Sequence, residues 1–536
     1  MKISFRVPVQ KLEKLKKYID SIIDPSSVAI IAIAMSVAMT IFAFMTDTIV
    51  SYGDAESHLN IAKRVIHSIT PGFAQLGGIW LPLPHLLMVP FVAVDSLWRT
   101  GLAGSIVSGM AFIISSVYVY KTSLILTKNN ITSFVAFLIF ALNPNILYLQ
   151  STPMTELVLI MFFMLSSYYF IKYILDDSHM LYLLFAAFFG FCASLSRYDG
   201  WFLVIFEALG LILLYLKNLR SRDLFHELEG KLILFCTLAF FGVAIWMMWD
   251  FLILGDPFYF TNSQFSAKTQ QSNWLQRGEL PGYHNIVQSF LYYAVTAMSN
   301  AGIFFFVIAI AGFVMYLRDK KQSHRYLISM IFLIPLIFNV VTLFLGQSVI
   351  FIPHLTPTTF EWTLFNVRYG AMFVPFIALF FAYMWTKVPN KGRVFLAFII
   401  VCQALLYTIG YSKIVSRDDG TIGLSHAKRP DAEQWLARNY DDGLVLLDDY
   451  ARTVSILRTN IPMQNVIYIG NKPYWEESLV QPEKYAVWIV MQKDDAVWKA
   501  LLGNPITEDR LYKYFQKTYT SDEILIFKRS NVPAKR

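Results

Sequence analysis

The chain has 536 residues, of which 56% are hydrophobic and only 15% are charged, whereas a soluble globular protein carries about 25% charged residues. The formal net charge of +8 does not indicate a nucleic-acid partner, because the basic residues lie in short loops between apolar runs. Together with a mean hydropathy of +0.49, this composition excludes an ordinary soluble domain and predicts a polytopic α-helical membrane protein.

Apolar runs long enough to cross a bilayer recur from residue 28 to about residue 415. They predict a transmembrane domain over 28–415 with about eleven helices, preceded by a basic, partly amphipathic leader at 1–27. The proline-rich segment 81–98 is expected to be a re-entrant or interfacial helix, because its early prolines break a span. The predicted spans are 28–47, 101–126, 131–150, 156–175, 180–196, 201–216, 232–254, 287–317, 326–346, 366–386 and 394–413.

The distribution of basic residues predicts how these helices are oriented. If the N-terminus is cytoplasmic, the inner segments hold 18 Lys or Arg residues, and the longer outer segments hold 6. This bias is the one that cytoplasmic loops carry. We therefore expect a multi-pass plasma-membrane protein with a cytoplasmic N-terminus, an extracytoplasmic active site and an extracytoplasmic C-terminal region.

The C-terminal region, 420–536, has a different pattern. Short apolar strands are predicted at 443–447, 466–469 and 486–491, with helical stretches at 450–457, 473–480 and 494–501. Alternating strands and helices indicate a small α/β domain with a mostly parallel sheet. Residues 523–527 are expected to add a final edge strand.

Two carboxylates and an imidazole follow the first predicted span, at the start of the outer loop 48–100. Asp54 and His58 are four residues apart and would share one face of a helix, and Glu56 lies between them. Ionisable groups at a membrane boundary are costly unless they have a function. A carboxylate here can act as a general base or bind a divalent cation, but Asp near a helix N-terminus also stabilises the helix by itself.

Later outer loops contribute an acid and three cations. Glu156 lies at the mouth of the fourth span, where it is a catalytic candidate or a helix cap. Arg197 and Arg368 lie at outer span ends, and an arginine fork suits a phosphate; the alternatives are an ion pair with Asp199 for the first and snorkelling to the interface for the second. Lys268, in the long loop 255–285, is a third candidate for a phosphate contact.

Further side chains near these candidates are expected to line the substrate site. They are His58, His85, Tyr198, Asp199 and Tyr369. The lone His85 is expected to be structural or acceptor-lining rather than a metal ligand. The sequence contains no Walker A loop and no nucleotide-binding glycine motif, so the donor of a transferred group would have to come from the membrane.

Four short stretches resemble one known family. Residues 152–156, 197–201, 255–260 and 367–369, read with the acidic first loop, resemble the GT-C superfamily of integral-membrane glycosyltransferases. The likeness covers about 50–415 and is to prokaryotic members of the branch that contains protein O-mannosyltransferases and the aminoarabinose transferases of lipid A. The C-terminal α/β domain is similar to those appended to many such enzymes, although it departs from the aminoarabinose branch.

The resemblance implies an inverting transfer of a sugar, of hexosyl or mannosyl type, from a polyprenyl-phosphate donor such as a dolichyl phosphate. It implies that Asp54 is the base that deprotonates the acceptor hydroxyl, and that Glu56 or Glu156 orients the acceptor or assists. Arg197 and Arg368 would hold the departing lipid phosphate. No cofactor is firmly implied, but related oligosaccharyltransferases use a divalent metal, so a metal held by Asp54, Glu56 and Glu156 stays open.

Two other functional classes also fit a chain of this kind. One is a transporter or flippase of a lipid-linked or polar solute, although no hydropathy repeat supports it. The other is a non-catalytic assembly partner whose C-terminal domain binds a protein. The expected partners of the transferase are the lipid-linked sugar, an acceptor protein, glycan or lipid, and the membrane, with no nucleic acid.

Overall fold

A computed structural model describes residues 23–176, 179–216, 222–353, 355–357, 364–410, 412–423, 428–450 and 453–530. The chain forms two compact units. The helical unit is made of residues 1–48, 79–84 and 105–423, and the loop–cap unit is made of residues 49–78, 85–104 and 424–536. Most of the predicted leader, residues 1–22, lies outside the described residues.

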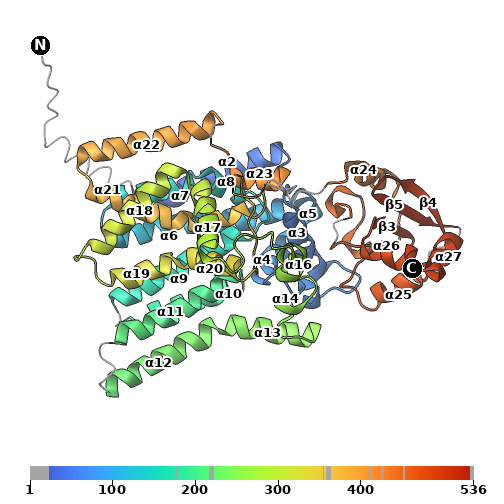
Figure 1. The fold of residues 1–536 in the computed structure, drawn as a ribbon, viewed down its shortest axis with the longest axis horizontal. Coiled ribbons are helices and arrows are strands. Elements are labelled where there is room, and N and C mark those ends of the chain that lie inside the picture. The colour runs from blue at the N-terminus through green and yellow to red at the C-terminus, as the bar shows by residue number, and fades with distance from the viewer. Residues whose placement is uncertain are drawn as a thin grey trace, which may run out of the picture. The chain divides into compact units, whose positions relative to one another are not determined.

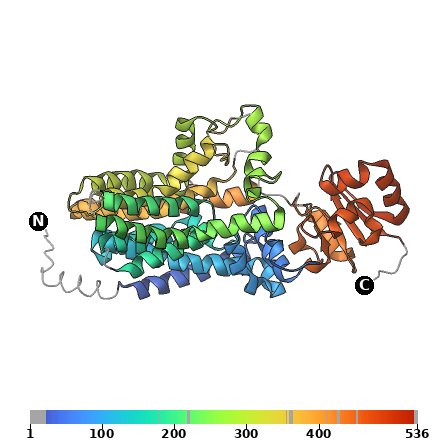
Figure 2. The same ribbon diagram turned by 90° about the horizontal axis from the view of Figure 1, so that it is seen from below.

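The helical unit consists of long apolar helices that pack along one another. In Figures 1 and 2, α10 lies beside α9, α11 and α12, and it packs against all three. The helices of this unit are α2 (Pro25–Met45), α6 (Leu102–Thr127), α7 (Asn130–Ala141), α8 (Pro144–Gln150), α9 (Glu156–Leu175), α10 (Met180–Ser194), α11 (Asp199–Tyr215), α12 (Arg222–Ala239), α13 (Phe241–Leu254), α14 (Tyr259–Asn262), α15 (Ala267–Gln270), α16 (Ser272–Gln276), α17 (Ile286–Ala301), α18 (Ile303–Arg318), α19 (Arg325–Phe332), α20 (Ile334–Phe344), η3 (Val367–Phe373), α21 (Val374–Lys387), α22 (Asn390–Thr408) and α23 (Val415–Ile422).

Each of the eleven predicted runs lies on a helix or a helix pair of the described residues. Among the described residues, five helices are long and apolar enough to cross a membrane, or up to nine if each of four bent pairs counts as one span. The shorter apolar helices α10 and α11 match two more runs. The run 287–317 is not one straight span, because α17 and α18 meet at an angle of 112°. Gly302, between the two helices, has a backbone φ of 92°, a value that residues other than glycine rarely adopt.

The loop–cap unit joins the first outer loop to the C-terminal domain. The first loop supplies α3 (Gly53–Ile66), η1 (Phe73–Leu76), α4 (Leu83–Val92), which begins in the helical unit, and α5 (Asp95–Thr100). The C-terminal part supplies α24 (Pro430–Asn439), η4 (Ile456–Arg458), η5 (Met463–Asn465), α25 (Tyr474–Val480), η6 (Pro482–Lys484), α26 (Ala496–Leu502) and α27 (Pro505–Tyr514). Residue Ile69 of the first loop packs against the apolar core of the C-terminal part, so the two segments share one core.

The C-terminal sheet has five strands in the order β2-β1-β3-β5-β4. They are β1 (Val445–Leu447), β2 (Val466–Ile467), β3 (Trp488–Gln492), β4 (Phe515–Thr520) and β5 (Ile524–Arg529). The predicted α/β architecture is confirmed, but three details were wrong. The sheet is mixed, since β3–β5 and β5–β4 pair antiparallel; β5 is an inner strand because β4 covers its outer side; and the predicted helix at 450–457 is only the short 3-10 turn η4 in its described part.

Candidate functional site

A cluster of opposite charges is buried in the helical unit. Glu156 is fully buried at the first residue of α9, and two arginines donate to its Oε1: Arg197 Nη1 at 3.2 Å and Arg368 Nε at 3.1 Å. Asp199 lies 3.5 Å from Arg197 Nε, and Asp419 lies 3.7 Å from Arg368 Nη1. These five residues are the Glu156 cluster.

The backbone around the cluster is tightly packed. Arg368 lies on η3, and the neighbouring Gly370 approaches α17 so closely that a Cβ atom there would lie 2.4 Å from the Thr296 carbonyl oxygen. Asn300 of α17 donates to the carbonyl oxygen of Val367 at 2.7 Å. The position of Arg368 is therefore fixed by backbone contacts, and not by its charge partners alone.

The two arginines of the cluster differ in their exposure. The Arg197 side chain is 19% exposed, and the Arg368 side chain is 4% exposed. Both guanidinium groups lie about 5 Å from the centre of the Tyr369 ring, at 5.1 and 5.2 Å. Arg197 also donates to the Thr155 hydroxyl. Of the two, Arg197 is therefore the one that an anion from outside can reach more easily.

The contacts of the Glu156 cluster decide between the alternative roles that the sequence left for Glu156, Arg197 and Arg368. Glu156 is not the cap of its helix, since Thr155 is the N-cap residue of α9 and Glu156 instead accepts from two arginines. The suggested ion pair between Arg197 and Asp199 is present, and Arg368 is buried in protein instead of reaching toward an interface. Oε2 of Glu156 has no hydrogen bond from any described residue.

The other predicted residues of the helical unit lie in different surroundings. The Tyr198 hydroxyl donates to the Ile79 carbonyl oxygen at 2.7 Å, and its ring stacks against Phe260. Lys268 lies on the short helix α15 and is exposed. Neither residue belongs to the Glu156 cluster.

The acids of the first loop lie in the loop–cap unit. Asp54 and Glu56 occupy the first turn of α3, and Lys63 and Arg64 occupy its last turns, an order that matches the helix dipole. Asp54 is partly exposed. Glu56 is hydrogen-bonded to the Ser455 side chain and to the backbone of Leu457.

The surroundings of Glu56 disfavour its ionised form. Burial, together with the nearby carboxylates Asp449 and Glu433, raises the pKa of Glu56 to about 7, against the smaller opposing effect of its hydrogen bonds. Glu56 is therefore on the edge of protonation at neutral pH.

The two predicted histidines also come together. His58 Nδ1 lies 2.9 Å from His85 Nε2, and both rings are buried. A hydrogen bond between two imidazoles requires one ring nitrogen to carry the proton and the other to accept it. The pair joins α3 to α4 and supports the structural interpretation of His85.

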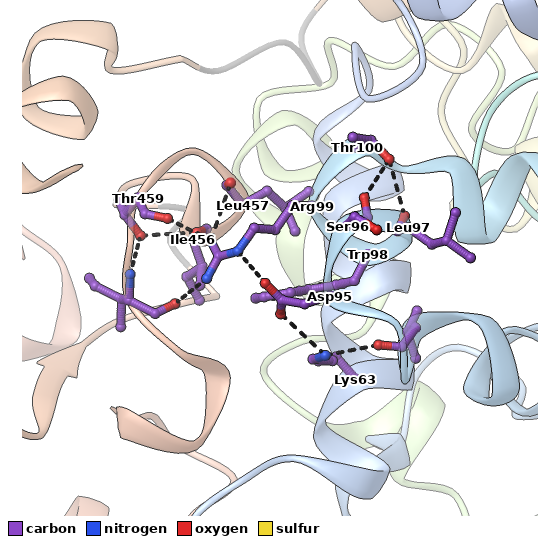
Figure 3. Close-up of polar contacts among 12 residues, drawn as sticks. Lys63, Asp95, Ser96, Leu97, Trp98, Arg99, Thr100, Ile456, Leu457 and Thr459 are labelled. Carbon is purple, nitrogen blue, oxygen red and sulfur yellow. Dashed lines mark hydrogen bonds and ion pairs between the residues drawn. The ribbon is translucent and has the colours of Figure 1, made fainter.

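Basic residues of the first loop connect it to the C-terminal part (Figure 3). Arg99 donates to the carbonyl oxygens of Thr459 and Ile461 and is paired with Asp95 at 2.8 Å. Arg64 is paired with Asp449 and lies 3.8 Å from the centre of the Tyr468 ring. These residues were not predicted, because nothing in the sequence connects position 64 or 99 to a loop more than 350 residues away.

No group of three or more His, Cys, Asp or Glu side chains is close enough to hold a metal ion within the described ranges. Sequence analysis also missed Asp419, which pairs with Arg368. A signal for it was present, since Asp418 and Asp419 are consecutive acids shortly after the last predicted span, which ends at residue 413.

No protein-family model matches the chain, and no curated protein matches it. Among solved structures, ArnT from Cupriavidus metallidurans bound to undecaprenyl phosphate is similar, with 9% identity and a TM-score of 0.54 over 92% of this chain and 97% of that chain. The apo state of the same protein gives 11% identity and a TM-score of 0.50 over the same shares. An Archaeoglobus fulgidus oligosaccharyltransferase gives 12% identity and a TM-score of 0.46 over 87% of this chain and 69% of that chain. The chain therefore has the fold of ArnT, which confirms the predicted polytopic helical fold with a C-terminal α/β domain.

Proposed function

We propose that this protein is a glycosyltransferase that moves a sugar from a polyprenyl-phosphate donor to an acceptor hydroxyl on the extracytoplasmic face of the membrane. The observation that carries the proposal is the shared fold with ArnT, which was solved with undecaprenyl phosphate bound, over nearly the full length of both chains. The acids and arginines found in the two units are the groups that such a reaction requires.

In the proposed reaction, the Asp54 carboxylate takes the proton of the acceptor hydroxyl. The acceptor oxygen then forms a bond to the anomeric carbon, and the bond from that carbon to the phosphate oxygen breaks with inversion. The electron pair leaves with the polyprenyl phosphate, whose negative charge Arg197, Arg368 and Lys268 stabilise. The greater exposure of Arg197 makes it the first candidate for direct contact with the phosphate.

Glu156 is proposed to hold the two arginines in place and to orient the acceptor. Its Oε1 accepts from both arginines, which keeps their guanidinium groups close together. Oε2 is buried and accepts no hydrogen bond from a described residue, so we propose that the acceptor hydroxyl reaches it only on entering the cluster.

The test of the base uses the purified full chain with undecaprenyl-phosphate-linked sugars and a panel of lipid, glycan and peptide acceptors. Asp54→Asn is expected to lower turnover by about 10²–10⁴-fold, the usual contribution of a general base, while donor affinity stays unchanged. Glu476→Gln, an exposed acid of α25, is the matched control. Full turnover in Asp54→Asn would reject the base, and transport of the lipid-linked sugar without transfer would favour the flippase alternative.

The test of the phosphate site compares donor affinity in three variants. Arg197→Ala should weaken undecaprenyl-phosphate binding, and Arg197→Lys should recover part of it, because a lysine keeps the charge but not the fork. Glu156→Gln leaves both arginines in place and should hold or increase donor affinity while it lowers turnover. If Arg197→Ala binds the donor normally, the phosphate role of Arg197 is wrong.

A further inference from the structure

One short loop of the C-terminal domain is held by the first loop at both of its ends. At one end, the Arg99 guanidinium donates to carbonyl oxygens of the loop: Nη1 to Thr459 at 2.6 Å, with longer contacts to Ile456 and Leu457, and Nη2 to Ile461 at 3.2 Å. An arginine has five donors in a rigid fork and can serve several carbonyls at once. We call residues 455–461 the anchor loop.

Arg99 is connected back to α3 through one acid. Its Nε donates to Asp95 at 2.8 Å, and the other oxygen of Asp95 lies 3.4 Å from Nζ of Lys63. Lys63 lies on α3 and is buried, and both cations lie 4.9 Å from the centre of the Trp98 ring. Figure 3 shows this chain of contacts, from Lys63 through Asp95 to Arg99 and on to the loop.

The other end of the anchor loop returns to the same helix. The Ser455 side chain and the Leu457 backbone are hydrogen-bonded to Glu56, in the first turn of α3. The contacts therefore form a closed ring: it leaves α3 at Lys63, passes through α5 and the anchor loop, and comes back to α3 seven residues earlier at Glu56.

A closed ring restrains a helix more than a single contact does. A single hydrogen bond leaves α3 free to rotate about its axis or to shift along it. Two attachments nearly two turns apart fix both the rotation of the helix and its position along the axis. Asp54 is two residues before Glu56, so its backbone moves with the same turn.

We infer that Arg99 and Glu56 are positioning residues, through which the anchor loop of the C-terminal domain sets the orientation of Asp54. The inference rests on the proposed function, since it takes Asp54 to be the base. It differs from a purely structural role of the ring, which would change stability and leave the turnover of folded protein as it is. A catalytic carboxylate has to meet its proton within hydrogen-bond distance, and a misplacement of about 1 Å can lower a rate by about 10²-fold.

Glu56 adds a pH-dependent element to this ring. The charged groups that face it are Asp449 and Glu433, both acids, and Asp449 is itself paired with Arg64. Loss of the Glu56 proton adds a third negative charge to this group. The ring should therefore loosen as the pH rises, and Glu56→Gln, which stays neutral, should remove that dependence.

The experiment measures turnover, donor KM and amide hydrogen exchange on the full chain. Arg99→Ala is expected to lower kcat by at least about ten-fold with donor KM unchanged, and to speed exchange at residues 53–57 while β3 keeps its protection. Arg99→Lys keeps the contact with Asp95 but loses the fork, so its kcat should fall between those of Arg99→Ala and the unmodified protein. Arg438→Ala, at an exposed arginine of α24, is the matched control.

The outcomes separate this inference from the proposed function. If Asp54→Asn is inactive but folded Arg99→Ala turns over normally, the positioning role is wrong and the proposed function stands. If Asp54→Asn is fully active, the assigned base is wrong, and hydrogen exchange alone decides whether the ring restrains α3. Unchanged exchange at 53–57 in Arg99→Ala would overturn the inference in either case, and a kcat of Glu56→Gln that falls with pH as in the unmodified protein would overturn the role of Glu56.

Discussion

Glu156 and Glu56 are the same residue type in opposite electrostatic surroundings. Glu156, in the helical unit, accepts from two arginines at 3.1–3.2 Å. Glu56, in the loop–cap unit, has neutral hydrogen-bond donors and two other carboxylates nearby. The arginines near the first loop have other partners than Glu56: Arg64 pairs with Asp449, and Arg99 donates to backbone carbonyl oxygens.

This difference shows that the partners of an acid matter as well as its burial. An acid that accepts hydrogen bonds from two arginines fixes the positions of both cations, so it is suited to a permanent charge cluster. An acid that has only neutral donors is close to protonation at neutral pH, so it is suited to a contact that depends on conditions.

The largest effect is expected from Glu156→Ala. Removal of one partner from a buried ion pair costs about 3–5 kcal/mol, and here two arginines lose their common partner and keep only the longer contacts with Asp199 and Asp419. Thermal unfolding of the purified protein should show the loss. Glu56→Ala, in the other unit, is the comparison and should destabilise less; equal losses would contradict the contrast.

The second effect concerns the backbone that places Arg368. Gly370→Ala puts a Cβ atom 2.4 Å from the Thr296 carbonyl oxygen, and overpacking of this kind costs about 1–3 kcal/mol. We expect a lower unfolding temperature together with weaker donor binding, since η3 must shift. Gly230→Ala, where a Cβ atom meets nothing within 4 Å, is the control and should show neither change.

The third effect is a pH dependence of stability. The folded-state pKa of Glu56 is raised to about 7 from 4.5, so its contribution to folding is fully present below about pH 4.5 and is lost as the pH rises through about 7. Glu56→Gln lacks this loss and should be the more stable protein at pH 8, by on the order of 1 kcal/mol. The difference should shrink below pH 6, as measured by unfolding temperatures across pH. A difference that does not vary with pH would mean that Glu56 titrates normally.

The smallest effect on stability is expected at Lys268, which is exposed in the helical unit. Substitutions at such positions usually change the free energy of unfolding by less than about 0.5 kcal/mol, so Lys268→Ala should unfold like the unmodified protein. If Lys268 contacts the lipid phosphate, its donor affinity should still fall and should become less sensitive to salt. Unchanged donor affinity would remove Lys268 from the phosphate site.

The helices of the membrane domain could be predicted, because a long apolar run is stable in a bilayer only as a helix. The helices at 25–45, 102–127 and 156–175 match runs that were predicted from hydropathy alone. The 112° bend between α17 and α18 was missed, because a single Gly in an apolar run does not distinguish a straight span from a broken one. The edge strand β4 was missed for a related reason: its residues are mostly polar and exposed, so they carry no apolar signal.

The sequence was enough to choose the candidate residues, but it could not predict which residues they contact. Acids and arginines at the ends of apolar runs indicate function because charge is costly there. Hydropathy cannot say that Arg368 reaches back to Glu156 across 212 positions, or that Glu56 meets a loop near residue 455. Those contacts depend on how the helices and the C-terminal domain pack.

The sequence by itself determined the class of the protein, the length and order of most helices, and the presence of a C-terminal α/β domain, because these follow from the local cost of placing polar groups in lipid and from strand periodicity. Only the tertiary structure decided that two arginines donate to Glu156 and that the first loop shares a core with the C-terminal domain. Both depend on contacts between residues far apart in the chain, and the free energy of a charge is set by those neighbours and not by its place in the sequence.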